Sequence, residues 1–394
     1  MKTKILILIL FGLFIIPACQ EEFETPDTDA LRPEKAALVG EGTIVTEMMH
    51  VKALEGNLLG DPADRIIRVY LPKSYYTNPE KRFPVIYFLH GTPAWGGMLM
   101  ESEPYEFFYL SAQLSARVDF PEEGFLPWLN NLVNNEGMKE AIIVMADAQT
   151  KYGPSIYVNS SVEGNYEDYI VKDLVKFIDS NFRTIDHFNW RAITGHCAGA
   201  YGALKLAMKH PDIFRYVAGL SPSHFPRETI MYMAAFMSVE DEMWEPMGAP
   251  AGPLPYDPLQ PFKFVNNSLY FLMQAWLPNP ANPPYLADLP FTFVDGVPVM
   301  DEDLMKKVDE QNLMALSQKY RQGLKKLKTV YFDCGMNDDL MMYTPNVMLD
   351  QQLSDMHIKH QFESFEGTHI NHLYQRLEKA LVMLSNDFPE RDDE

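Results

Sequence analysis

One five-residue turn constrains the fold of this chain more than any other feature. It covers residues 195–199, in the order Gly-His-Cys-Ala-Gly, with Cys197 at its centre. An apolar run precedes it and a helix-like run, 200–210, follows it. A strand, a tight turn with glycine at both ends and then a helix is the layout of a nucleophile elbow, which presents a strained central residue at a helix N-terminus. In most proteins built this way that residue is serine, and here it is Cys197.

Strands and helices alternate on both sides of this turn. We expect strands at residues 43–52, 65–71, 83–89, 141–146, 190–194, 216–220, 329–332 and 360–365. The runs 83–89 and 141–146 are apolar almost throughout, as in strands that are covered on both faces. Further helices are expected at 125–134 and 165–182, in a broken pattern over 98–118, from about 345, and at the end of the chain to about 384. This order predicts an α/β fold with a mostly parallel central sheet flanked by helices.

The alternation stops after the sixth strand, at about Pro222. Ten prolines lie between residues 246 and 284, interleaved with methionine and aromatic residues. A structureless loop of this length is unusual in a compact domain, so we interpret residues 223–327 as an insertion over the carboxyl edge of the sheet. Within it we expect helices at 229–237, 267–276 and 301 to about 327. Its composition favours an adaptable apolar pocket wall, with simple packing as the alternative.

The first residues are typical of a targeting segment. Lys2 and Lys4 precede an apolar run that is too short to span a bilayer, which indicates a secretory signal. The run closes in Ile-Pro-Ala-Cys, which resembles a bacterial lipobox with Cys19 as the lipidated residue. An ordinary signal peptide with a chance cysteine is the alternative. We therefore expect a lipoprotein signal peptide over 1–18, a tether over 19–40 and the α/β domain over 41–390, on an outer-membrane or cell-surface lipoprotein.

Charge and composition exclude several classes of partner. The net charge of the 394 residues is −21, and it becomes −23 if the signal, with its two lysines and no acidic residue, is removed. Such a surface repels polyanions, which argues against nucleic-acid binding. No metal-ligand spacing such as His-Glu-x-x-His is present, so we expect no metal and no cofactor. Membrane contact is expected only through the lipid anchor, and the oligomeric state stays open.

An acidic residue and a histidine follow the last two expected strands. Asp338 and His369 each lie just past a strand's carboxyl end, where ligand sites of open α/β sheets are found. The order Cys197, Asp338, His369 is that of nucleophile, acid and base. We expect His369 to take the proton of Cys197, and Asp338 to orient the imidazole. Asp339 is the alternative acid, and His372 the less favoured base.

Attack by Cys197 on an acyl carbonyl would place negative charge on its oxygen, which needs N–H donors. We expect one from Ala198 and one from Thr92, in a loop that Gly91 allows to approach closely. Gly91, His196 and His224 are candidates for lining the substrate site, with packing as the alternative for the histidines.

The remaining cysteine, Cys334, is expected to be a buried thiol at a strand end rather than a second nucleophile. An exported protein could pair its two remaining cysteines, Cys197 and Cys334. The expected strands that carry them are not neighbours, so two free thiols are predicted.

These residues resemble the putative-esterase family of the α/β-hydrolase fold, which includes feruloyl and acetyl-xylan esterases and S-formylglutathione hydrolases. The resemblance is carried by residues 157–173 and 195–221 and extends over about 68–384, most weakly in the insertion. The family's elbow reads Gly-His-Ser-Met-Gly-Gly, against Gly-His-Cys-Ala-Gly-Ala here. Asp338 falls on the family's acid and His369 on its Gly-x-His base.

The resemblance implies an exported hydrolase of carboxylic acyl esters, on small molecules or polysaccharide decorations, that works through an acyl-enzyme. Cysteine in place of serine departs from the family's pattern, although dienelactone hydrolases use Cys-His-Asp on this fold. Two alternatives stay open: a catalytically inactive lipoprotein that binds a carbohydrate or ester, and an acyltransferase that uses the same triad.

Overall fold

The computed structural model describes residues 41–91, 124–255 and 263–390. Several sequence predictions lie outside these ranges and stay predictions: the signal peptide, lipidation at Cys19, the tether, the helical pattern over 98–118 and the N–H of Thr92. Within the described ranges, no helix is both long and apolar enough to cross a bilayer.

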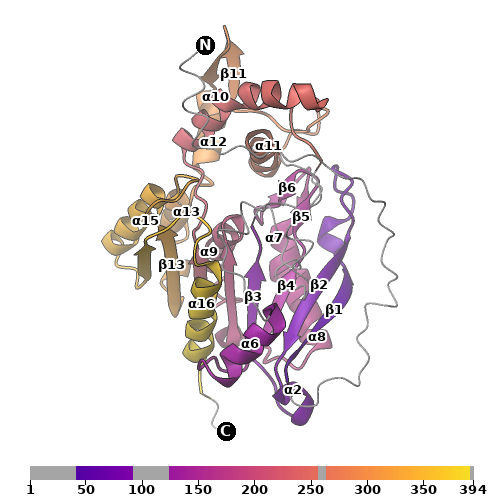
Figure 1. The fold of residues 1–394 in the computed structure, drawn as a ribbon, viewed down its shortest axis with the longest axis vertical. Coiled ribbons are helices and arrows are strands. Elements are labelled where there is room, and N and C mark those ends of the chain that lie inside the picture. Colours follow the sequence, from indigo (N-terminus) through magenta and orange to yellow (C-terminus); the bar gives the residue numbers. More distant parts are fainter. Residues whose placement is uncertain (1–40, 92–123, 256–262, 391–394) are drawn as a thin grey trace.

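An eight-stranded sheet forms the middle layer of the molecule (Figure 1). From one edge to the other its strands are β1 (Thr43–His50), β2 (Asp64–Leu71), β4 (Ile142–Ala146), β3 (Val85–Leu89), β9 (Arg191–His196), β10 (Tyr216–Leu220), β13 (Thr329–Gly335) and β14 (Gln361–Phe365). The pairs β1–β2 and β2–β4 are antiparallel, and all the others are parallel. The predicted α/β fold with a mostly parallel sheet is confirmed.

The strands β3, β4 and β10 are apolar throughout because each face of the sheet packs into its own core. In β3, for example, Tyr87 belongs to one core and Phe88 to the other. Helices cover both faces (Figure 1): α6 (Phe125–Asn134) and α16 (Leu373–Asp387) pack on one, and α8 (Val175–Asn181) and α9 (Ala198–Lys209) pack on the other. Alternating side chains of a strand point to opposite faces, so both sets of side chains of these three strands are buried.

The helix predicted over 165–182 is present, but it is not uniformly α-helical. It consists of α7 (Tyr166–Asp168), a π-helical segment η3 (Tyr169–Leu174) and then α8. The remaining elements of the sheet domain are η2 (Lys52–Leu54), α2 (Ser74–Thr77), the short strands β5 (Gln149–Thr150), β6 (Gly153–Pro154), β7 (Asn159–Ser160) and β8 (Gly164–Asn165), η4 (Phe188–Trp190) and α15 (Tyr343–Asp355).

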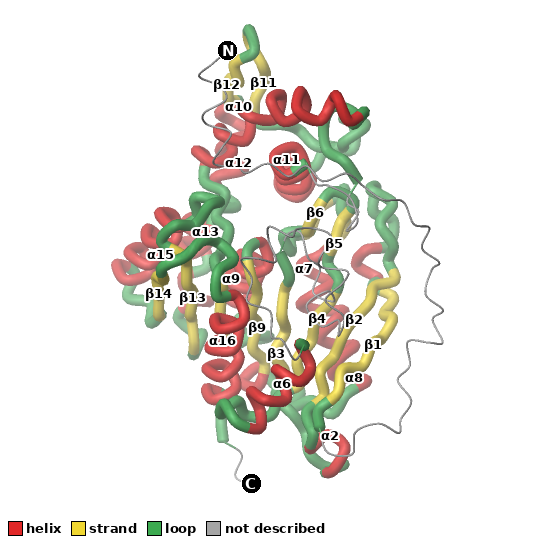
Figure 2. Tube along the Cα trace, in the orientation of Figure 1, coloured by secondary structure: helices red, strands yellow, loops and turns green. Residues whose placement is uncertain are grey.

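Between β10 and β13 the chain leaves the sheet and builds a separate group of elements (Figure 2). These are α10 (Arg227–Trp244), η5 (Glu245–Met247), α11 (Phe264–Trp276), β11 (Phe291–Val294), β12 (Val297–Met300), α12 (Glu302–Asp309), α13 (Leu313–Lys319) and α14 (Arg321–Leu324). The ring centroid of Trp276, at the end of α11, lies 6.2 Å from that of Tyr201 and 6.0 Å from that of Phe225. These contacts hold α11 close to the residues that follow β9 and β10.

The single helix predicted over 301–327 is wrong, because the chain forms the three short helices α12, α13 and α14. Asp301 caps the first, and its side chain accepts hydrogen bonds from the N–H groups of Asp303 and Leu304. Asn312 caps the second and accepts from Met314. An N-cap residue has a non-helical backbone, so the cap at Asn312 interrupts the helix.

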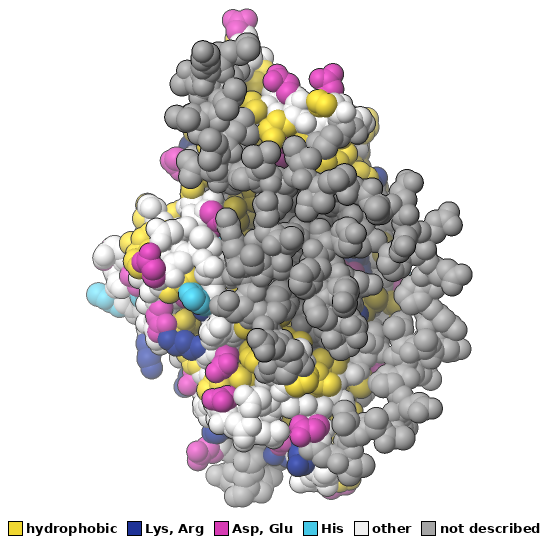
Figure 3. Space-filling view, viewed as in Figure 1, with side chains coloured by type: hydrophobic (Ala, Val, Ile, Leu, Met, Phe, Trp, Pro, Cys, Tyr) yellow, Lys and Arg dark blue, Asp and Glu magenta, His cyan; other side chains and the backbone are white. Residues whose placement is uncertain are grey.

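The β11–β12 hairpin was not predicted from the sequence. Its turn is the pair Asp295 (φ 51°) and Gly296 (φ 77°), which join Val294 directly to Val297. Asp-Gly between runs of apolar residues is a strong hairpin signal, so the information was present in the sequence. Apolar side chains gather on the surface at the upper end of the molecule, around α10 and the hairpin (Figure 3). In the hairpin, Val294 and Val297 are 55% and 61% exposed.

Candidate active site

The turn between β9 and α9 has the strained geometry expected of an elbow. Cys197 takes φ 58° and ψ −122°. A Cβ atom on Gly199 would lie 1.9 Å from the carbonyl oxygen of Leu89, and one on Gly195 would lie 2.5 Å from the carbonyl carbon of Gly199. Since both distances are far below van der Waals contact, glycine is required at both positions.

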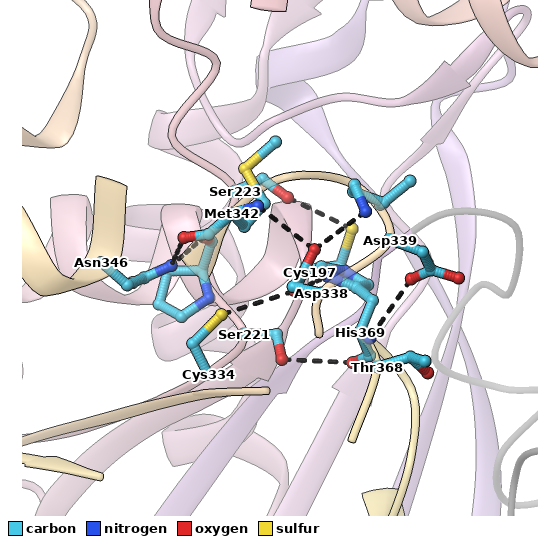
Figure 4. Close-up of polar contacts among 12 residues, drawn as sticks. Cys197, Ser221, Ser223, Cys334, Asp338, Asp339, Met342, Asn346, Thr368 and His369 are labelled. Atoms are coloured by element: carbon cyan, nitrogen blue, oxygen red, sulfur yellow. Dashed lines mark hydrogen bonds and ion pairs between the residues drawn. The ribbon is translucent and has the colours of Figure 1, made fainter. Parts of the chain in front are cut away.

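His369 and Asp338 meet beside Cys197 although 31 residues separate them (Figure 4). Nδ1 of His369 lies 2.7 Å from Oδ2 of Asp338. The other carboxylate oxygen, Oδ1, accepts the backbone N–H groups of Leu340 at 2.9 Å and Met342 at 3.2 Å. These three contacts leave the carboxylate little freedom to turn away from the imidazole.

Of the two candidate acids, only Asp338 has its carboxylate on the imidazole ring. Asp339 instead accepts a hydrogen bond from the backbone N–H of His369, at 3.3 Å. The two neighbouring carboxylates thus hold different parts of the same histidine.

The environment favours a thiolate–imidazolium pair at Cys197 and His369. Burial by itself raises the pKa of the Cys197 thiol, but the charge of His369 outweighs it and the pKa lies below its ordinary value. Burial by itself lowers the pKa of His369, but Asp338 and Cys197 raise it well above its ordinary value. Nε2 of His369 is buried and makes no hydrogen bond to the described residues. The pKa of Asp338, which burial would raise, is lowered to about 2, chiefly by the charge of His369.

Two backbone segments lie close to Cys197. The N–H of Ala198, at the start of α9, helps to lower the pKa of the Cys197 thiol. Gly91 lies so close that a Cβ atom there would be 2.7 Å from the Cβ of Cys197. Tyr157 fixes this loop, because its hydroxyl donates to the carbonyl oxygen of His90 at 2.7 Å. Thr92, the other predicted donor, lies beyond the described residues.

His196 and His224 are both buried and engaged by protein groups. Nε2 of His196 lies 3.1 Å from the carbonyl oxygen of His369, and burial holds the pKa of His196 well below its ordinary value. His224 is fully buried, and its Nε2 lies 3.0 Å from Oδ1 of Asn346. These are the contacts of packed side chains, and substrate contact by either histidine stays a prediction.

Cys334 lies behind the acid rather than beside the nucleophile. Its thiol is 3.4 Å from Oδ2 of Asp338, and burial raises its pKa, so it stays protonated and can donate to the carboxylate. Cys197 and Cys334 are both free, on strands separated by β10, as predicted.

Sequence reasoning missed a buried group that holds the backbone of His369. The hydroxyl of Ser221 and Nη1 of Arg376 both donate to the carbonyl oxygen of His369, at 3.1 and 3.3 Å. Arg376 is itself paired with Asp333, through Nη2–Oδ1 at 2.6 Å and Nε–Oδ2 at 3.0 Å. No spacing in the sequence predicts that Ser221, Asp333 and Arg376 come together, because they lie on or next to three separate elements.

Ser223 was also missed, and it touches the sulfur itself. Its Oγ lies 3.3 Å from Sγ of Cys197. The available signal was its position, since it lies just past the carboxyl end of β10, beside the elbow.

Among the residues that the structure describes, no group of three or more His, Cys, Asp or Glu side chains is placed to hold a metal ion.

Comparison with known proteins identifies a family and several relatives. Residues 62–377 match the protein family described as "Putative esterase". An esterase of Mycobacterium tuberculosis is 25% identical over 228 residues, which are 55% of this chain and 44% of that protein. An endo-1,4-β-xylanase/feruloyl esterase of Xylanibacter ruminicola is 28% identical over 170 residues, 41% of this chain and 20% of that protein. The chain therefore matches less than half the length of these relatives.

Among solved structures, a ferulic acid esterase superimposes with a TM-score of 0.52. The match covers 89% of this chain and 99% of that one, at 19% identity. At this identity the likeness shows the fold, which is that of the α/β-hydrolase esterases.

Proposed function

Because the chain belongs to the family described as "Putative esterase", we propose that it hydrolyses carboxylic esters with Cys197 as nucleophile, His369 as base and Asp338 as orienting acid. The observation that carries this proposal is the intact relay from Asp338 to His369, at 2.7 Å, beside a thiol whose pKa is lowered. A site kept only for binding has no need of an imidazole whose orientation and charge are both held.

In the resting site the thiol proton has already passed from Sγ of Cys197 to Nε2 of His369, and the reaction begins when the thiolate attacks the acyl carbonyl carbon. The oxygen that gains negative charge is stabilised by the N–H of Ala198 and by the N–H expected from Thr92. As the tetrahedral intermediate collapses, the C–O bond to the alcohol breaks and His369 protonates the departing oxygen. The acyl group is then held as a thioester on Cys197.

The second half regenerates the enzyme. His369, now neutral, takes a proton from water, and the hydroxide attacks the thioester carbonyl. Collapse expels the Cys197 thiolate and releases the carboxylic acid, while the proton on His369 restores the ion pair. An acyltransferase differs only in that an alcohol replaces water in this step, so the acceptor distinguishes the two activities.

For the substrate, we propose ester decorations of polysaccharides. Two similar proteins support this class: the relative named endo-1,4-β-xylanase/feruloyl esterase and the solved structure named ferulic acid esterase. We further propose export as a lipoprotein anchored through Cys19. Metabolic labelling with a lipid precursor tests the anchor, since the label should be present in the full-length chain and absent from Cys19→Ala.

The test of the hydrolase uses the full chain with p-nitrophenyl and feruloyl esters, followed by intact mass and product release. We expect an acyl adduct that turns over in the wild type and is absent from Cys197→Ala. Turnover in Cys197→Ser but not in the wild type would contradict a cysteine hydrolase, because the cysteine would then have silenced an intact scaffold. Absence of adduct and turnover in both would favour a binding protein.

A further inference from the structure

The side chain of Ser223 lies against the sulfur of Cys197. It follows β10, and its backbone N–H donates to the carbonyl oxygen of Cys197 at 3.3 Å. The Cys197 N–H in turn donates to the carbonyl oxygen of Leu220 at 3.0 Å. These two backbone bonds lock the segment after β10 against the elbow. They fix the position of the Ser223 side chain, which is fully buried with Oγ 3.3 Å from Sγ.

We propose that Ser223 is a fourth catalytic residue, whose hydroxyl donates a hydrogen bond to the Cys197 sulfur and stabilises it as the thiolate. The proposal rests on Cys197 being the nucleophile, as argued above. Once His369 has taken the thiol proton, the sulfur can only accept hydrogen bonds, so Ser223 must be the donor in that pair. No proton leaves Ser223: the proton moves from Sγ to Nε2 of His369, and the O–H bond of serine stays intact.

The chemistry of sulfur explains why this site benefits from such a donor. A triad serine stays protonated until the substrate is attacked, so it forms no standing anion. A cysteine beside an imidazolium is an anion in the resting enzyme, and a buried anion needs donors. Hydrogen bonds to a charged acceptor are stronger than those between neutral groups. The Ser223 hydroxyl thus adds to His369 and the N–H of Ala198, which also lower the pKa of the Cys197 thiol.

Other groups that titrate near the sulfur do not duplicate this role. His369, from the loop after β14, is the cation of the pair. Tyr157, which precedes β7, also faces Cys197, but burial raises its pKa well above its ordinary value and its hydroxyl is engaged with His90. Asp338 acts through His369. Ser223 is therefore the one uncharged side-chain donor to the sulfur among the described residues.

The test is the rate at which the full-length protein is alkylated by iodoacetamide as a function of pH, with the modified residue identified by peptide mass. In Ser223→Ala we expect the apparent pKa of the Cys197 thiol to rise by about one unit, so alkylation on the acidic limb slows about tenfold. At high pH the rate should equal or slightly exceed that of the wild type, because a thiolate of higher pKa is intrinsically more nucleophilic.

Thr194→Val is the matched control. Thr194 lies on β9, three residues before Cys197, fully buried, and its hydroxyl has no hydrogen-bond partner among the described residues. Removing it should leave the pH profile unchanged. Ser223→Gly also lacks the hydroxyl, so it must give the same shift in the apparent pKa of the Cys197 thiol as Ser223→Ala. If the alanine variant does not fold, the glycine variant takes its place in the test.

A Ser223→Ala or Ser223→Gly profile that superimposes on the wild type would overturn the proposal, as would an equal shift in Thr194→Val. This readout needs no substrate, so it can be separated from the esterase proposal. Missing ester turnover with a shifted thiol profile would refute only the hydrolase, whereas turnover with an unshifted profile would refute only the role of Ser223.

Discussion

Two tight turns in this molecule use left-handed backbone conformations, and they are held in opposite ways. At the elbow, Cys197 (φ 58°) is buried, and the flanking Gly199 touches the main chain of β3. At the β11–β12 hairpin, Asp295 and Gly296 also have positive φ, but a Cβ atom on Gly296 would meet nothing within 4 Å. The strained backbone of the elbow is therefore maintained by packing against the rest of the domain, whereas the backbone of the hairpin turn is maintained by its own residues.

The polar groups near the two turns differ in the same way. Around the elbow, His369 and Asp338 reach the nucleophile from separate strands and are held by backbone donors and by Arg376. In the insertion, buried charge serves the fold: Lys263 is fully buried and its Nζ bonds Asp241 at 2.8 Å. We infer that the carboxyl edge of the sheet carries the chemistry, while the insertion shapes the surface above it.

The largest expected effect is that of Gly199→Ala. Its Cβ would lie 1.9 Å from the carbonyl oxygen of Leu89, so β3 or α9 must move. We expect a loss of at least about 3 kcal/mol in the free energy of unfolding, measured by denaturant titration, or failure to fold. A variant as stable as the wild type would break the comparison, because the elbow would then not be held by its packing.

Asp338→Asn should abolish most activity with little change in the fold. The asparagine cannot stabilise the imidazolium and can hold the ring in the wrong tautomer, so kcat/KM for an ester should fall about 10³–10⁴-fold. Asp339→Asn is the matched control, since the Asp339 carboxylate accepts the backbone N–H of His369 rather than a ring N–H. It should lose less than about tenfold, and equal losses in both variants would remove the distinction between the neighbouring carboxylates.

His224 makes stability depend on pH where the insertion leaves the sheet. Burial lowers its folded-state pKa to about 4, so the folded protein binds fewer protons than the unfolded chain in the window from about 6.5 down to 4. The free energy of unfolding should therefore fall by about 3 kcal/mol as the pH drops through that window. Denaturant titrations of the wild type and His224→Gln at several pH values measure this dependence of the free energy of unfolding on pH. If the variant showed the same dependence as the wild type, a group other than His224 would be responsible for it.

The smallest expected effect is that of Gly296→Ala at the hairpin. Because a Cβ atom has free space there, the cost is limited to the left-handed backbone, about 1 kcal/mol. Thermal unfolding in parallel with Gly199→Ala gives the comparison directly. A loss as large as that of Gly199→Ala would mean that both turns are held by their surroundings.

The same contrast explains what the sequence could predict. The elbow could be predicted from the sequence because its tight turn requires glycine at both ends. The order Cys197, Asp338, His369 could be predicted because each of these residues follows the end of a strand. The roles of Ser223 and Arg376 could not be predicted in this way, because they depend on contacts that form only in the folded protein. Ser223 contacts Cys197, 26 residues before it, and Arg376 contacts His369, 7 residues before it. The break in the helix predicted over 301–327 depends on a cap at Asn312, a polar residue that also occurs inside helices.

The central claim is that Cys197 is a thiolate whose charge is held by His369. Its most direct test is the rate of alkylation of Cys197 near neutral pH in the wild type and in His369→Ala. The account predicts rapid modification of the wild type and at least about tenfold slower modification of the variant, because the paired cation is gone. Slow modification of both proteins at the same rate would contradict it, because Cys197 would then be an ordinary buried thiol.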